Sequence, residues 1–323
     1  MRWLRVQGPS TVAAARSAAR ALASQLRFPD PRAEQLVVAV SEAASNLQKH
    51  AQDGSLLVRV NHDTDMPGIE LVTIDSGPGV RDLGKALRDG QSSAGTLGIG
   101  LGAIRRMADL CDLYSVPGHG TTLVARFWPE PRRPAIGCAG LSRPITGEAS
   151  CGDIYGAFHA GPLLTGVLCD GLGHGPLAAA AASEALAAVA EAPAEEPSVL
   201  LGRVHRRLSR TRGGAVAIAQ IDGPTVRFAG LGNVAAWILA GDSRSGMVSV
   251  PGIAGHQARK LRQFEYPMPP RGAVVLHSDG LSSRWDAREL PGLVTADPLV
   301  LAAALLAEAG THRDDASVLV LKP

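Results

Sequence analysis

The chain has 323 residues, which is enough for two domains of ordinary size. Hydrophobic residues make up 46% of it and charged residues 19%, so it can bury substantial cores. The formal net charge of +2 gives no reason to expect nucleic acid or an anionic membrane as a partner.

The four cysteines contain no CxxC pair and have no histidine at zinc spacing, which favours reduced thiols. The first residues, MRWLRVQGPS, lack the apolar segment of a signal peptide. No uncharged run reaches the roughly 18 apolar residues that suggest a membrane span. We therefore expect a soluble, cytoplasmic protein, and no pattern indicates its oligomeric state.

The first half of the chain predicts helices packed on a sheet. Helices are expected over Thr11–Arg27 and from Asp30 to about His50, with Asp30 as N-cap and Pro31 at the first helical position. A further helix is expected from about Leu101, after a glycine-rich stretch. The predicted strands are Ser55–Asn61, Ile69–Asp75, Cys111–Ser115 and Thr122–Phe127.

Repeated prolines in residues 129–134 predict a short, semi-rigid linker. Beyond it, helices are expected over Pro176–Ala190 and Pro197–Arg210. Short apolar strands are expected at Leu163–Cys169, Ala215–Ile221, Val226–Ala229, Ala235–Leu239, Ala273–His277 and Ser317–Leu321. The pattern predicts an α/β (α+β) protein with domains at 1–128 and 135–323.

Polar residues recur on the second predicted helix. Glu42, Asn46 and His50 are four residues apart, so they share one face, and Lys49 adjoins it. By itself, this pattern fits a solvated polar face as well as a ligand-binding one.

Three glycine-containing motifs follow in the same half. Asp75-Ser76-Gly77-Pro78-Gly79 ends a strand, where a carboxylate suits recognition of a base amino group. Gly98-Ile99-Gly100-Leu101-Gly102 opens a helix, where free N–H groups form an anion site. Gly118-His119-Gly120-Thr121-Thr122 precedes a strand. Taken singly, the first and third motifs are also compatible with a plain turn, and a lone glycine run such as the second is weak evidence for a ligand site.

In this order and spacing, the four elements together resemble the N, G1, G2 and G3 boxes of the GHKL ATPase superfamily, over about residues 10–128. The closest resemblance is to anti-sigma-factor and stressosome switch serine kinases. It implies an α/β sandwich that binds ATP and Mg²⁺, with Val80–Thr96 as the ATP lid. The implied roles are Asn46 for Mg²⁺, Asp75 for adenine, Gly77 and Gly79 for the base pocket, Thr121 as support of Asp75, and Lys49, Gly98, Gly100 and Gly102 for the phosphates.

In these kinases the residue at the position of Glu42 is the base that takes the proton from an attacking serine hydroxyl. The Gly98 motif is not a dinucleotide fingerprint, because no βαβ start precedes it, nor a Walker loop, because no Gly-Lys-Ser/Thr follows. No helical hairpin with a phosphoacceptor histidine precedes it, which argues against a histidine kinase.

Four acidic motifs mark the second half: Cys151-Gly152-Asp153, Cys169-Asp170-Gly171-Leu172-Gly173-His174-Gly175, His277-Ser278-Asp279-Gly280-Leu281 and Arg313-Asp314-Asp315-Ala316-Ser317. Asp-Gly pairs are ordinary turn formers at strand ends. Carboxylates at sheet ends can also converge on hard cations, which prefer oxygen ligands. Two such ions can activate a water for attack on phosphorus.

Together these motifs resemble the PPM family of Mg²⁺/Mn²⁺-dependent serine/threonine phosphatases, in particular the sporulation-stage-II-E type, over residues 135–322. The resemblance implies a β-sandwich flanked by helices and two Mn²⁺ or Mg²⁺ ions. Asp170 and the Gly171 carbonyl would bind metal, as would Asp279 and Asp314, with Asp153 at the site directly or through water and Asp315 supporting it. His174 would be either a leaving-group acid or a loop histidine, and Cys169 would fill the core.

Both resemblances together predict a bacterial partner-switching regulator. The kinase half is expected to phosphorylate a STAS-domain anti-anti-sigma protein, and the phosphatase half to hydrolyse phosphoserine or phosphothreonine. One alternative makes the N-terminal domain a non-catalytic ATP sensor or sigma-factor-binding module. A second alternative is an interaction protein in which both sites have lost activity.

Overall fold

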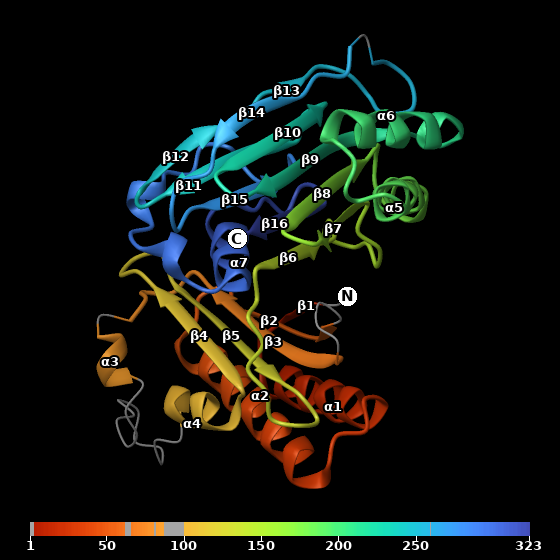
Figure 1. The fold of residues 1–323 in the computed structure, drawn as a ribbon. Coiled ribbons are helices and arrows are strands. Elements are labelled where there is room, and N and C mark those ends of the chain that lie inside the picture. Colours follow the sequence, from red (N-terminus) through yellow and green to blue (C-terminus); the bar gives the residue numbers. More distant parts are fainter. Residues whose placement is uncertain (1–2, 62–65, 81, 87–99, 259) are drawn as a thin grey trace. The chain divides into compact units, whose positions relative to one another are not determined.

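The computed structural model describes residues 3–61, 66–80, 82–86, 100–258 and 260–323 (Figure 1). The chain divides into two compact units, Met1–Ala135 and Ile136–Pro323. Each unit combines β-sheet with helices, so the predicted two-domain α+β class is confirmed.

The first unit is a five-stranded antiparallel sheet with helices on one face (Figure 1). Its strand order is β1 (Trp3–Arg5), β2 (Ser55–Asn61), β3 (Gly68–Asp75), β5 (Thr121–Phe127) and β4 (Leu110–Ser115). The helices are α1 (Pro9–Gln25), α2 (Asp30–His50), α3 (Leu83–Ala86) and α4 (Gly100–Met107).

Periodicity explains how this unit packs. Ala15, Ala19 and Ala23 repeat every four residues and present one buried face of α1 to the core. Alternate strand residues, such as Ile69 and Leu71 of β3, face the same core. Small alanine side chains therefore allow the helices to approach the sheet closely.

The start of α2 differs in detail from the prediction. Pro29 is the N-cap residue and Asp30 is the first helical residue, and no side chain caps the helix. The predicted N-cap role of Asp30 is therefore wrong, although an acidic residue in the first turn still interacts favourably with the helix dipole.

The second unit contains two sheets packed face to face. One has the order β13 (Ser249–Val250), β10 (Thr225–Leu231), β9 (Gly214–Asp222), β8 (Leu163–Gly171) and β7 (Asp153–Ala160), and β14 (Phe264–Pro267) also pairs with β10. The other has the order β12 (Ser243–Gly246), β11 (Ala235–Ala240), β15 (Ala273–His277), β16 (Ala316–Leu321) and β6 (Cys138–Arg143).

Two hydrophobic clusters hold the second unit together. One lies between the sheets and joins residues such as Leu168, Phe228 and Leu276. The other lies between the first sheet and two helices, α5 (Pro176–Ala190) and α6 (Pro197–Arg207), which Figure 1 shows on the outer side of β8 and β9. A third helix, α7 (Pro298–Ala309), packs on β16 and β6. The remaining elements are the short 3₁₀ helices Leu208–Arg210, Ala287–Glu289 and Leu293–Thr295.

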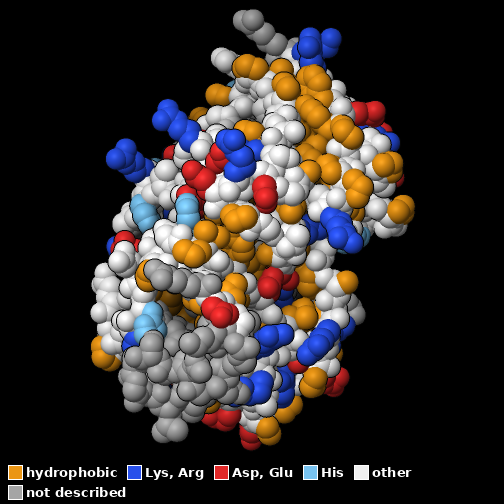
Figure 2. All heavy atoms as spheres, turned by 90° about the vertical axis from the view of Figure 1, so that its left-hand side faces the viewer, with side chains coloured by type: hydrophobic (Ala, Val, Ile, Leu, Met, Phe, Trp, Pro, Cys, Tyr) orange, Lys and Arg blue, Asp and Glu red, His pale blue; other side chains and the backbone are white. Residues whose placement is uncertain are grey.

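Acidic and basic side chains both occur across the described part of the face drawn in Figure 2. Within the described residues, none of the helices combines the length and the apolar character that crossing a membrane requires.

Candidate active sites

Asp75 forms the centre of the candidate nucleotide site in the first unit. It is the last residue of β3 and lies opposite Thr121 of β5. Burial raises the pKa of its carboxyl, while hydrogen bonds from the backbone of Gly77 and Thr121 oppose that rise. The Gly77 N–H donates to Asp75 Oδ1 at 2.7 Å. The carboxyl group is thus fixed in orientation at the end of a buried strand.

Glycines around Asp75 allow backbone segments to approach one another closely. A Cβ at Gly77 would lie 2.8 Å from Asp75 Oδ1. Gly79 has a φ of +70°, and a Cβ there would lie 2.4 Å from the Val116 carbonyl oxygen. At Gly120, with a φ of +82°, the corresponding distance to the Asp75 carbonyl oxygen is 1.8 Å. Larger residues at these positions would displace the Asp75 turn.

Ser115 is a contributor that the sequence reasoning missed. Its Oγ donates to the Gly120 carbonyl at 2.7 Å and accepts from the Val80 N–H at 2.8 Å. It also lies 3.0 Å from Thr121 Oγ1. A serine at a strand end carries no motif, so only the pairing of β4 with β5 reveals that it ties three segments together.

The polar face of α2 ends beside the Asp75 turn. Glu42 and Asn46 are partly buried and Lys49 is exposed, while neighbours such as Ala43 point into the core. The Ser76 N–H donates to the Gln52 carbonyl at 2.9 Å, which joins the segment after α2 to this turn. The roles assigned to these three side chains stay predictions.

The glycine motif before α4 is described only in part. Gly100 is the first residue of α4 and has open space around its Cβ position, and Gly102 is buried within the helix. Gly98 lies outside the described residues, as do residues 81 and 87–96 of the predicted lid.

In the second unit, strand pairing brings the carboxyl groups together. Asp153 opens β7 and lies directly opposite Asp170 of β8. Asp279 follows β15, whose partner β16 is preceded by Asp314. The two strand pairs belong to different sheets, and the carboxyl groups of the other three residues all raise the pKa of Asp170. The sandwich therefore places four dispersed motifs at one site.

Burial and mutual repulsion raise the pKa values of these carboxyl groups. Burial, reinforced by Asp153 and Asp279, raises the pKa of Asp170 to about 9. Burial also raises the pKa of Asp153 to about 7. Burial, followed by the charge of Asp314, also raises the pKa of Asp279. At neutral pH this group of side chains retains protons in the absence of positive charge.

Asp315 holds the backbone next to the carboxyl groups in place through hydrogen bonds. Its side chain is buried and accepts hydrogen bonds from the N–H groups of Ile145, at 2.8 Å, and Gly152, at 2.7 Å. The Gly152 carbonyl in turn accepts from the Gly171 N–H at 3.2 Å. Asp315 therefore positions the turn that precedes Asp153.

The donor chemistry of the group suits a hard divalent cation. Asp153 Oδ2 is buried and has no hydrogen-bond partner in the described part of the chain, so it is free to bind a cation. The Asp170 and Asp279 side chains hydrogen-bond to each other, and Asn233 donates to Asp279 Oδ2. Among the described residues no three Asp, Glu, His or Cys side chains form a closed ligand cluster.

A histidine and two cysteines also lie in the motifs that contain these carboxyl groups. His174 Nδ1 lies 3.0 Å from Glu148 Oε1, and both side chains are accessible. Burial raises the pKa of the Cys169 thiol strongly and that of Cys151 to about 12, so neither is a reactive thiolate at neutral pH.

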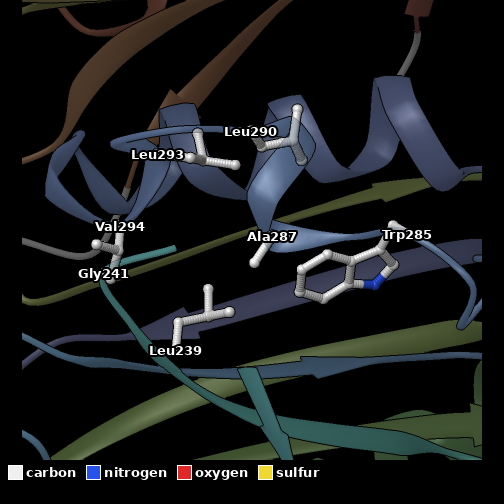
Figure 3. Close-up of a pocket in the computed structure, with 7 residues that line it drawn as sticks. All are labelled: Leu239, Gly241, Trp285, Ala287, Leu290, Leu293 and Val294. Carbon is white, nitrogen blue, oxygen red and sulfur yellow. The ribbon is translucent and has the colours of Figure 1, made fainter. Parts of the chain in front are cut away.

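A separate hollow in this unit is apolar (Figure 3). Figure 3 shows the six-membered ring of Trp285 turned toward Ala287, with the indole nitrogen on the far side. No carboxyl group lines it, so it is distinct from the site described above; the lining residues are Leu239, Gly241, Trp285, Ala287, Leu290, Leu293 and Val294.

Comparison with protein families assigns both halves of the chain. Residues 7–127 match the histidine kinase-like ATPase domain, and residues 164–323 match stage II sporulation protein E. Serine/threonine-protein kinase RsbT of Bacillus subtilis (strain 168) is 33% identical over 125 residues, which are 39% of this chain and 94% of RsbT.

Solved structures show similarity over the second half. A structure of RsbX in complex with magnesium has a TM-score of 0.51 and 17% identity, covering 57% of this chain and 92% of RsbX. A structure from a study of the bacterial stressosome has a TM-score of 0.49 and 24% identity, covering 58% of this chain and 98% of its own. The RsbX match shows a shared fold.

Proposed function

The chain belongs to the RsbT-like histidine kinase-like ATPase family through its first half and to the SpoIIE phosphatase family through its second, and we propose that it is a bifunctional partner-switching regulator. In this proposal, residues 1–128 form an ATP-dependent serine kinase, 129–134 a linker and 135–323 a phosphoserine/phosphothreonine phosphatase. The observation that supports it most is that one chain joins a relative of a protein kinase to the carboxylate site of a phosphatase.

The carboxylate site supports the hydrolytic half. Asp170, the Gly171 carbonyl, Asp279, Asp314 and Asp153 would hold two Mg²⁺ or Mn²⁺ ions. Such ions supply activation of a water and neutralisation of phosphoryl charge. Asp315 and the Asn233 amide would keep Asp153 and Asp279 in place while the substrate binds. Because burial raises the pKa of the Cys169 and Cys151 thiols, neither thiol competes as a nucleophile at this site.

The Asp75 site supports the transfer half. Asp75 would accept from the adenine amino group, and Gly77, Gly79 and Thr121 would shape the pocket around it. Asn46 would hold Mg²⁺, while Lys49, Gly98, Gly100 and Gly102 would face the phosphates. Glu42 would take the proton of the attacking hydroxyl, since it lies one helical turn from Asn46.

The substrate we propose is a STAS-domain anti-anti-sigma or stressosome protein in the cytoplasm, with a sigma factor as a further partner. The names of the relatives support this choice, because RsbT is a serine/threonine kinase and one similar structure comes from a stressosome study. Joining both sites in one chain raises the effective concentration of each near a substrate bound by the other.

The hydrolytic half is tested by Mn²⁺-dependent turnover of a chromogenic phosphate ester by the full chain. Asp170→Asn should abolish turnover, whereas the matched control Glu289→Gln, an exposed acidic residue of the same unit, should leave it unchanged. Wild-type protein that neither binds Mn²⁺ nor turns over ester would contradict the proposal.

One alternative for the first half is a non-catalytic ATP sensor or sigma-factor-binding module. A pure binding module has no need for a base at Glu42, which favours the kinase. The two are separated by Glu42→Ala, with Glu34→Ala as the control on the same helix. If the domain is a kinase, Glu42→Ala would lose phosphoryl transfer but keep ATP binding, and Glu34→Ala would keep both. If it is a sensor, no variant, including wild type, would show phosphoryl transfer.

A further inference from the structure

The Arg212 side chain lies over the loop that follows Asp170. The β8–β9 pairing sets Gly171 opposite Gly214, and just beyond it the Leu172 N–H donates to the Gly213 carbonyl at 3.0 Å. A Cβ built at Gly173 would lie 3.1 Å from Arg212 Nη1. Gly173 is two residues after Gly171, a chain distance of at most about 7 Å. The guanidinium group therefore lies over a loop position only two residues from Gly171 and three from Asp170.

The backbone around Arg212 is held in place by its neighbours. His256 Nε2 donates to the carbonyl oxygens of both Thr211 and Arg212 at 3.1 Å. The Gly213 N–H donates to Thr211 Oγ1 at 3.0 Å. Gly213 has a φ of +78°, and a Cβ there would lie 2.5 Å from the Ala254 carbonyl oxygen. This packing fixes the point from which the side chain extends.

The charge of Arg212 is not neutralised within the described ranges of the chain. Arg203, Arg207 and Arg227 of the same unit each form ion pairs with acidic side chains. Arg212 is exposed and forms none with any described residue. An exposed guanidinium that forms no ion pair with a described residue is a ready partner for an incoming anion.

The substrate of the proposed phosphatase carries a phosphoryl anion, which needs positively charged partners at the site. A guanidinium offers two parallel N–H donors that match two phosphoryl oxygens, and such charge-assisted bonds are stronger than neutral ones. We propose that Arg212 binds the phosphoryl group of the substrate, an inference that rests on the phosphatase activity proposed above.

The test compares Arg212→Ala and Arg212→Lys in the full chain with Arg210→Ala, an exposed arginine two residues away. The readouts are KM and kcat for a chromogenic phosphate ester, calorimetric binding of inorganic phosphate to the Mn²⁺-loaded protein, and the Mn²⁺ dissociation constant. In Arg212→Ala, loss of a charge-assisted hydrogen bond should raise KM, and the dissociation constant of inorganic phosphate, about tenfold or more.

Arg212→Lys should fall between wild type and Arg212→Ala, because lysine keeps the charge and loses the paired donors. The Mn²⁺ dissociation constant should stay at the wild-type value in all variants. Unchanged phosphate binding in Arg212→Ala would overturn the inference, and so would a parallel loss of Mn²⁺ binding, which would make Arg212 a support of the loop. Wild-type protein that binds phosphate through Arg212 but turns over no ester would instead contradict the proposed phosphatase activity.

Discussion

Asp153 and Asp170 lie directly opposite each other on β7 and β8, burial raises the pKa of both carboxyl groups, and the charge of Asp153 raises that of Asp170 further. Two acidic residues at such a position destabilise the ionised site unless positive charge is present. The strand pairing therefore favours binding of a cation when both carboxyl groups are ionised.

Mn²⁺ should bind more tightly as the pH rises from 6 to 9. In the metal-free chain the pKa of Asp153 is about 7 and that of Asp170 about 9, so a bound cation must displace protons. Calorimetry in two buffers of different ionisation enthalpy should show proton release at pH 7. Binding that is independent of pH would contradict this origin of the raised pKa values.

The metal-free protein should lose stability as the pH rises from about 5 to 9. The folded-state pKa values of Asp153 and Asp170 exceed the ordinary value of 3.8, so the folded chain holds more protons than the unfolded chain in this window. Its melting temperature should therefore fall with pH, and added Mn²⁺ should restore it most at high pH. A melting temperature that rises over this range in a chelator would exclude the explanation.

Replacing Asp315 by alanine should destabilise the second unit. The substitution leaves the N–H groups of Ile145 and Gly152 without their acceptor in a buried place, at a cost of about 2–4 kcal/mol in the free energy of unfolding. Urea denaturation measures this loss, with Glu289→Gln as control. Because Asp315 positions the turn before Asp153, Mn²⁺ affinity should fall as well; a variant with wild-type stability and affinity would refute this role.

Gly120→Ala should abolish nucleotide binding, whereas Gly118→Ala should not. Both glycines have positive φ, +82° and +89°, so both substitutions strain the backbone. Only at Gly120 would the added Cβ collide, 1.8 Å from the Asp75 carbonyl oxygen, while at Gly118 no atom lies within 4 Å. The affinity of each variant for a fluorescent ATP analogue tests this difference. An equal loss of affinity in Gly120→Ala and Gly118→Ala would mean that backbone strain alone, and not the collision, is responsible.

The sequence predicts best the elements whose hydrophobic pattern is strictly local. The ranges Pro176–Ala190 and Ala273–His277 are confirmed, because a proline in the first helical turn or an apolar run marks their ends. The helix that ends at His50 begins at Asp30 and not at Pro31 as predicted. The helix α7 was missed because PLVLAAALLAEA is apolar on all sides and so lacks a helical period. The strand β7 was missed because Gly156 and His159 interrupt its apolar pattern.

Some site residues could be predicted from short sequence motifs, whereas others are found only in the folded structure. The sequence singles out Asp153, Asp170, Asp279 and Asp314 as acidic residues beside glycine or at strand ends, and the sandwich explains how they can act together. The hydrogen bonds of Ser115 and the position of the Arg212 side chain over Gly173 depend on pairing between strands that are separate in the sequence. Such relationships leave no short motif, so they emerge only from the folded chain.

The most direct test of the account is the intact mass of a STAS-domain protein incubated with ATP, Mg²⁺, Mn²⁺ and the full chain. Wild type, Asp170→Ala and Glu42→Ala would be compared. The account predicts that Asp170→Ala accumulates a STAS protein heavier by one phosphoryl group, while wild type and Glu42→Ala do not. If no variant ever adds a phosphoryl group, yet wild type removes one from pre-phosphorylated STAS protein, the proposed kinase activity is contradicted.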